Sequence, residues 1–135
     1  MSEVFADSSY WIGLLYRRDQ LHGRVGAIKP KLQSVRVVTS EMVLTEIFNA
    51  SSHDRYLRKG AVVFVEGLRQ YGDVLVLPQT SEQFEAAFQK YKKNHDKEWS
   101  LTDCASFVIM EERGIRAALT QDHHFVQAGF EALLR

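Results

Sequence analysis

Four acidic residues stand out in this 135-residue chain because each follows or opens an apolar segment. They are Asp7, Glu46, Asp103 and Asp122. A carboxylate beside a buried element is costly unless a partner offsets its charge. A shared divalent cation is the simplest partner for several carboxylates at once. The four acids therefore predict a site for Mg²⁺ or Mn²⁺.

The chemistry open to such a cluster is the hydrolysis of a phosphodiester bond. Without a cation, clustered carboxylates repel one another and raise their own pKa values. Hard oxygen ligands that leave water molecules on the metal suit phosphate substrates. A bound cation lowers the pKa of its water, and a second cation roughly 4 Å away can stabilise the leaving oxygen. Such a site needs no side-chain nucleophile.

Short β-rich runs alternate with longer helical patterns along the chain. The predicted strands cover residues 4–6, 35–38, 74–77, 115–119 and 130–134. The predicted helices cover residues 9–16, 21–33, 40–51, 55–71, 81–91 and 101–113, with a short one from residue 123. Strands separated by helices indicate parallel pairing through right-handed crossovers. We expect one α/β domain spanning residues 1–135.

Helix-capping signals support several of these boundaries. Thr80 with Gln83, and Ser100 with Asp103, fit the capping-box pattern before an apolar run. Gly114 follows the helix that ends at residue 113.

This alternation predicts that the four acids share one edge of the sheet. Helix N-termini lie beside strand C-termini in parallel α/β sheets, and ligands bind there. Asp7 and Asp122 follow predicted strands, whereas Asp103 and Glu46 lie early in predicted helices. Whether the four are neighbours depends on strand order, which the sequence leaves open.

Composition and charge limit the kinds of partner and compartment to expect for this protein. Basic and acidic residues both number 17, so binding to a polyanion requires a local basic patch. A single cysteine, Cys104, excludes an internal disulfide framework. The sequence indicates neither a signal peptide nor a membrane-spanning stretch, so we expect a cytoplasmic protein without membrane contact. Candidate phosphate contacts are Arg17, Arg18, Arg55, Arg58, Lys59, Lys90, Lys92, Lys93 and Lys97.

Four segments resemble those of PIN domains and, within that group, of VapC-type toxin ribonucleases. They are residues 5–9, 39–46, 100–106 and 119–125, with Gly129 and Phe130 behind the last. The resemblance covers essentially the whole chain and maps the family's four acids, in order, onto Asp7, Glu46, Asp103 and Asp122. It implies a three-layer α/β/α sandwich with a central, mostly parallel sheet.

The resemblance also implies a function and partners. It implies a metal-dependent endoribonuclease for single-stranded or looped RNA, in which the four acids bind Mg²⁺ or Mn²⁺. It implies a homodimer held inactive by a small antitoxin that inserts a segment into the acidic groove. We expect the apolar helix at residues 9–16, followed by Arg17 and Arg18, to receive that segment, or else to be core or dimer contact. Many PIN domains are not toxins, so a non-toxin nuclease is an alternative.

Each acid also has an interpretation that needs no metal. Asp7 or Asp122 could cap the helix that follows it. Asp103 could serve the Ser100 capping box alone, and Glu46 could lie on a solvated helix edge.

Other functions and sites are disfavoured. Adjacent histidines on a helix should point in different directions, so His123 and His124 predict no zinc site, although either could contact RNA. A catalytically silent RNA- or protein-binding module would not require all four acids. An aspartyl-phosphate protein with Asp7 as acceptor lacks the second aspartate of one such class, since residue 9 is serine.

Overall fold

A five-stranded parallel sheet, in the order β3-β2-β1-β4-β5, forms the centre of the molecule. The computed structural model describes residues 2–71 and 73–135. In the central pairs, Phe5 lies opposite Val38 on one side and Ala118 on the other. The strands are β1 (Glu3–Ala6), β2 (Arg36–Ser40), β3 (Val74–Leu77), β4 (Ala117–Leu119) and β5 (Glu131–Ala132).

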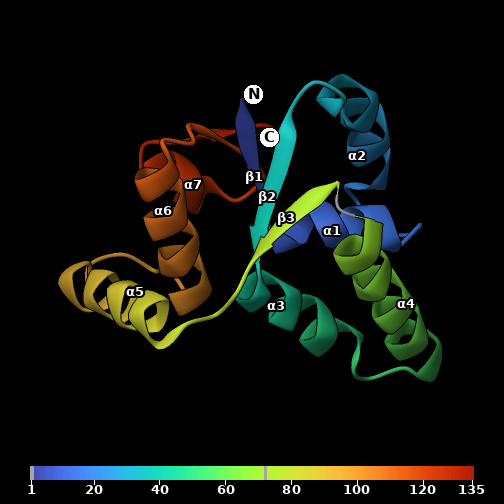
Figure 1. The fold of residues 1–135 in the computed structure, drawn as a ribbon, viewed down its shortest axis with the longest axis horizontal. Helices are drawn as coiled ribbons and strands as arrows, with labels where there is room; N and C mark the ends of the chain where they lie inside the picture. Colours follow the sequence, from blue (N-terminus) through green and yellow to red (C-terminus); the bar gives the residue numbers. More distant parts are fainter. Residues whose placement is uncertain (1, 72) are drawn as a thin grey trace.

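Helices cover both faces of this sheet (Figure 1). One layer contains α1 (Ser8–Leu15), α2 (His22–Ile28), α3 (Glu41–Ser51) and α4 (Arg55–Tyr71). The other contains α5 (Ser81–Lys93), α6 (Leu101–Arg113) and α7 (His123–Gln127). The predicted α/β/α sandwich is confirmed, and every strand pair is parallel.

A buried polar contact fixes the start of α1 against the central strands. The Trp11 indole N–H donates to Thr39 Oγ1 at 3.1 Å, and that hydroxyl donates to the Ala6 carbonyl at 2.8 Å. Both side chains are buried, so each polar atom needs such a partner. The contact ties β1, β2 and α1 together beside Asp7.

Two predicted elements differ from the structure. The helix predicted over residues 21–33 ends as an α-helix at Ile28 and continues as a 3₁₀ turn, Lys29–Leu32. Pro30 lacks a backbone N–H, which stops the α-helix there. The last strand, predicted over residues 130–134, is only Glu131–Ala132. The other boundaries agree to within about two residues.

Across residues 2–71 and 73–135, no helix has both the length and the apolarity that a membrane crossing requires.

Candidate active site

The acidic residues meet where the sheet changes its direction of growth. The strand order places β1 between β2 and β4, so the chain moves one way from β1 and later returns to its other side. Ligands bind at such switch points, beyond the strand C-termini. A cleft of about 500 Å³ lies here, and its lining includes Asp7, Ser8, Asp122 and His123.

Asp7 is buried in this cleft, with 6% of its surface exposed. It occupies the N-cap position of α1, yet its side chain makes no capping hydrogen bond. Its Oδ2 atom instead accepts a hydrogen bond from the Thr120 hydroxyl at 2.9 Å. Burial raises the pKa of Asp7 to about 7, and the charges of Glu46 and Asp103 add to the rise. Helix capping therefore does not account for this carboxylate.

Asp103 combines a helix cap with a place in the acidic cluster. The predicted capping box is confirmed, because Asp103 Oδ2 accepts from the Ser100 N–H at 3.1 Å and Ser100 Oγ accepts from the Asp103 N–H at 3.0 Å. The same Oδ2 lies 3.0 Å from His124 Nδ1. Burial raises the pKa of Asp103, and the charge of Asp122 adds to this. The cap holds the carboxylate at the start of α6.

Glu46 lies half-buried in the second turn of α3. Burial is the main cause that raises its pKa, and the charges of Asp103 and Asp122 raise it further. The side chains of Ser8 and Thr102 oppose this rise through hydrogen bonds. Glu46 is thus coupled to acids from other elements, which a solvated helix-edge residue would not be.

Asp122 is both a cap and a member of the cluster. Its Oδ1 atom accepts a hydrogen bond from the His124 N–H at 2.9 Å, so Asp122 does cap α7. Its own N–H donates to Thr120 Oγ1 at 3.0 Å. Because the buried Thr120 hydroxyl also donates to Asp7, one side chain connects the two aspartates that follow β1 and β4.

The charge of the cluster is poorly compensated by the protein. Within the part of the chain that the structure describes, the four carboxylates form ion pairs only with His123 and His124. Carboxylates whose pKa values are raised by burial, and which lie close enough for their charges to interact, suit a hard divalent cation. The residues present therefore fit the predicted Mg²⁺ or Mn²⁺.

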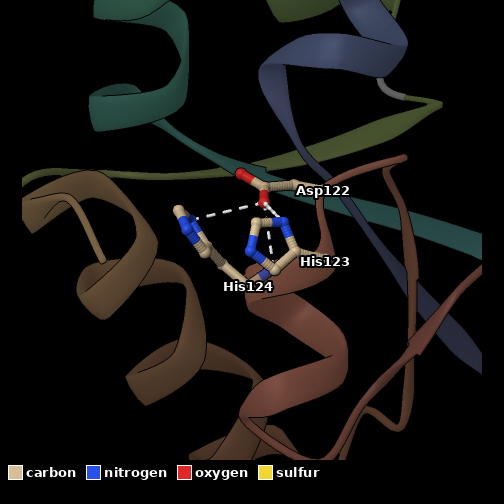
Figure 2. Close-up of side chains that lie close together, drawn as sticks. All are labelled: Asp122, His123 and His124. Atoms are coloured by element: carbon tan, nitrogen blue, oxygen red, sulfur yellow. Dashed lines mark hydrogen bonds and ion pairs between the residues drawn. The ribbon is translucent and has the colours of Figure 1, made fainter. Parts of the chain in front are cut away.

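The two histidines do not point apart, so that expectation is wrong. Their ring centroids are 4.5 Å apart, and both rings face Asp122 (Figure 2). Nδ1 of His123 lies 3.6 Å from Asp122 Oδ1, and Nδ1 of His124 lies 3.3 Å from the same atom. They form the first turn of α7, directly after its capping residue, which brings both rings back over the cap.

Some residues of the cleft were not found from the sequence. Asp19 lines the cleft, although its Oδ2 also accepts from the Leu21 N–H at 3.0 Å. It follows Arg17 and Arg18 in a loop, where nothing in the spacing marks it.

No lysine or arginine lines the described cleft. Of the candidate phosphate contacts, Arg55, Arg58 and Lys59 line a separate hollow, while Lys90 and Lys97 pair with Glu111 and Asp96.

The helix expected to receive an inhibitor is largely part of the core. Tyr10 and Trp11 of α1 are buried, whereas Ile12, Leu14 and Leu15 are half-buried. The core interpretation is therefore correct for the two aromatic residues. Exposed large apolar residues lie elsewhere in the described chain, including Phe84, Phe88 and Tyr91 on α5.

Comparison with known proteins identifies the family of this chain. The chain is 32% identical over 130 residues to the 23S rRNA-specific endonuclease VapC20 of Mycobacterium tuberculosis, in both strain CDC 1551 / Oshkosh and strain ATCC 25618 / H37Rv. The match covers 94% of this chain and 95% of each relative. The chain belongs to the VapC-type PIN-domain toxins. No family model matches the sequence.

Solved structures of other proteins share the fold of this chain. The crystal structure of M. tuberculosis VapC20, described as a Sarcin-Ricin loop cleaving toxin, superposes with a TM-score of 0.84 at 29% identity, covering 94% of this chain and 95% of that one. FitAcB from Neisseria gonorrhoeae superposes with a TM-score of 0.61 at 18% identity, covering 96% and 94%. The second likeness supports the fold alone.

Proposed function

We propose that the protein is a metal-dependent endoribonuclease and the toxin of a toxin–antitoxin pair. The observation that carries this proposal is the convergence of Asp7, Glu46, Asp103 and Asp122 from four parts of the chain. Burial raises the pKa of the first three, and no lysine or arginine in the described chain pairs with any of the four. A divalent cation would supply the missing charge.

The four carboxylates would hold Mg²⁺ or Mn²⁺. When bound, the ion supplies the positive charge that activates a water molecule and polarises the scissile phosphate. Neighbouring side chains fix the direction of the carboxylates. The Thr120 hydroxyl holds Asp7, the Ser100 N–H holds Asp103, and the His124 N–H holds Asp122. This prior orientation lowers the cost of arranging charge around the substrate.

Looped RNA is the proposed substrate. The relative is named for specificity towards 23S rRNA, and its crystal structure is described as that of a Sarcin-Ricin loop cleaving toxin. Unpaired loop nucleotides can splay apart and enter a cleft one at a time, whereas a fully paired helix holds its strands in a fixed geometry. The cleft beside Asp7 is open to such a strand.

The test is cleavage of a labelled stem–loop that carries the sarcin–ricin sequence, with a fully paired duplex of the same composition as the control. We expect a discrete cut in the loop with Mg²⁺ or Mn²⁺ and none after addition of a chelator. Full cleavage in chelator would refute the metal-dependent mechanism. Absence of cleavage under all conditions would favour a catalytically silent binding module.

The toxin assignment implies a small antitoxin as partner. Expression of the protein alone should slow growth, and co-expression with the neighbouring small reading frame should restore growth and yield a stable complex on size exclusion. Normal growth together with the absence of a complex would indicate a nuclease that is not a toxin.

A homodimer stays a prediction. Phe84, Phe88 and Tyr91 follow one another at helical spacing along α5 and are exposed, so a second copy of the chain would bury an apolar stripe there. We expect light scattering to give twice the chain mass for wild type and a monomer for Phe88→Glu, with Val63→Glu on α4 as the matched control.

A further inference from the structure

We propose that Asp122, His123 and His124 form a binding site for a zinc-class transition cation at the rim of the acidic cleft. This site differs in chemistry from the all-oxygen Mg²⁺ or Mn²⁺ site, although the two share Asp122. It goes beyond the proposed nuclease function and does not depend on RNA. Adjacent histidines on a helix were expected to diverge, but the rings of His123 and His124 converge on one carboxylate (Figure 2).

The distances suit a tetrahedral ion. Zinc binds nitrogen and oxygen at about 2.0–2.2 Å, which places ligand atoms of a tetrahedron about 3.4 Å apart. Asp122 Oδ1 lies 3.3 Å from His124 Nδ1 and 3.6 Å from His123 Nδ1, on either side of that value. One ligand atom from each of the three residues lies within 4.8 Å of the others. A small rotation of the His123 ring would bring its nitrogen into range of the same ion. The ring has room to rotate because 59% of that side chain is exposed.

Two of the three ligands are already oriented. Asp122 is held by the His124 N–H and donates its own N–H to Thr120. The His124 ring is confined, with 16% of its side chain exposed, and Nδ1 lies 3.0 Å from Asp103 Oδ2. Ligands fixed in this way bind a metal with less loss of conformational freedom.

The donor set selects the kind of cation. Imidazole nitrogen suits Zn²⁺, Co²⁺, Ni²⁺ and Cu²⁺, whereas Mg²⁺ takes oxygen ligands. Three protein ligands leave a further coordination position, and both Asp122 and His123 line the cleft. A cation bound to His124 Nδ1 would compete with Asp103 for that nitrogen, and it would also draw Asp122 away from the carboxylate cluster. Zinc-class ions should therefore inhibit Mg²⁺-dependent cleavage.

The test is calorimetric titration of metal-free protein with Zn²⁺, in the absence of RNA. We expect one tight site in wild type and a Kd raised about tenfold or more in His123→Ala and in His124→Ala, because each loses a ligand. Two exposed histidines far along the chain, His53 and His95, provide matched controls. Their alanine variants should keep the wild-type Kd. Co²⁺ should give the intense visible absorption of a four-coordinate site in wild type and lose it in both His123 and His124 variants.

A further variant separates the two metal sites. Glu46→Gln removes an acid of the carboxylate cluster without touching the Asp122–His123–His124 set, so it should retain Zn²⁺ binding. If Zn²⁺ affinity falls in Glu46→Gln and not in the two histidine variants, the ion sits among the carboxylates and the proposal is wrong. Absence of Zn²⁺ binding in wild type would equally refute it. Cleavage of RNA by wild type in zinc-free Mg²⁺ buffer tests the nuclease separately, so the two proposals can fail independently.

Discussion

Asp7 should make the metal-free protein less stable as the pH rises. Its pKa is raised from 3.8 to about 7 by burial, so the folded state holds a proton that the unfolded state has already released. The unfolded state is then favoured as pH increases between these two values. We expect the free energy of unfolding in chelator to fall from about pH 4 to pH 7 in wild type and to fall less in Asp7→Asn. Urea unfolding across this range measures it, and equal slopes would contradict it.

The same carboxylates should be indispensable for cleavage. Asp7→Asn and Asp103→Asn keep the side-chain shape and remove the charge that we propose binds the cation. Each should lower kcat by roughly 10²-fold or more. Glu112→Gln, an exposed change on the same helix as Asp103, is the control and should cleave at the wild-type rate. Wild-type rates in both aspartate variants would end the metal-nuclease proposal.

Residue types and their order were enough to single out the four acids, but not their surroundings. The Thr120 hydroxyl between Asp7 and Asp122, and the contact of His124 with Asp103, join residues that are 113 and 21 positions apart. Such contacts depend on side-chain rotamers and on the packing of α7 against α6, which no local pattern encodes. Asp19 likewise lines the cleft through tertiary packing, which its position after Arg17 and Arg18 does not encode.

At the scale of elements, the caps of α5 and α6 should contribute similarly to stability but differently to cleavage. Ser100 caps α6 and orients Asp103, whereas the side chain of Thr80 caps α5 by accepting from the Gln83 N–H and contacts no acid of the cluster. Ser100→Ala and Thr80→Ala should each destabilise the fold by about 1 kcal/mol. Only Ser100→Ala should also lower cleavage, because the Asp103 carboxylate loses its fixed geometry. Parallel unfolding and activity measurements distinguish the two effects, and equal activities would show that the cap does not position Asp103.

Local signals predicted most helices because capping residues, glycine and proline act over a few positions. The capping box at Ser100 and the left-handed Gly114, with φ of 69°, both lie where the sequence placed a helix boundary. Pro30 acts locally as well, since its missing backbone N–H accounts for the end of α2 at Ile28. Strand order could not be derived, since the placement of β1 between β2 and β4 depends on how whole faces of the sheet pack.

For the molecule as a whole, a divalent cation should act as a stabiliser. Mg²⁺ or Mn²⁺ that binds only the folded state at one hundred times its Kd adds about 2.7 kcal/mol to the free energy of unfolding. Thermal melts with and without metal should show a rise in Tm for wild type and a smaller rise for Glu46→Gln. In chelator, Glu46→Gln should melt at or above wild type, because one repelling charge is gone. A markedly lower melting temperature would mean that repulsion does not strain the cluster.

The order of the strands also bears on how the protein is made. During synthesis β1 leaves the ribosome long before β4, so one edge of β1 waits unpaired until residues 117–119 appear. Asp7 and Glu46 are synthesised well before Thr120 and Asp122, so the acidic cluster is incomplete until residue 122 has been made. We therefore expect a partly synthesised chain, which lacks Asp122, to be inactive as a nuclease. Until then the unpaired edge of β1 is prone to aggregation, and chaperones bind such exposed edges.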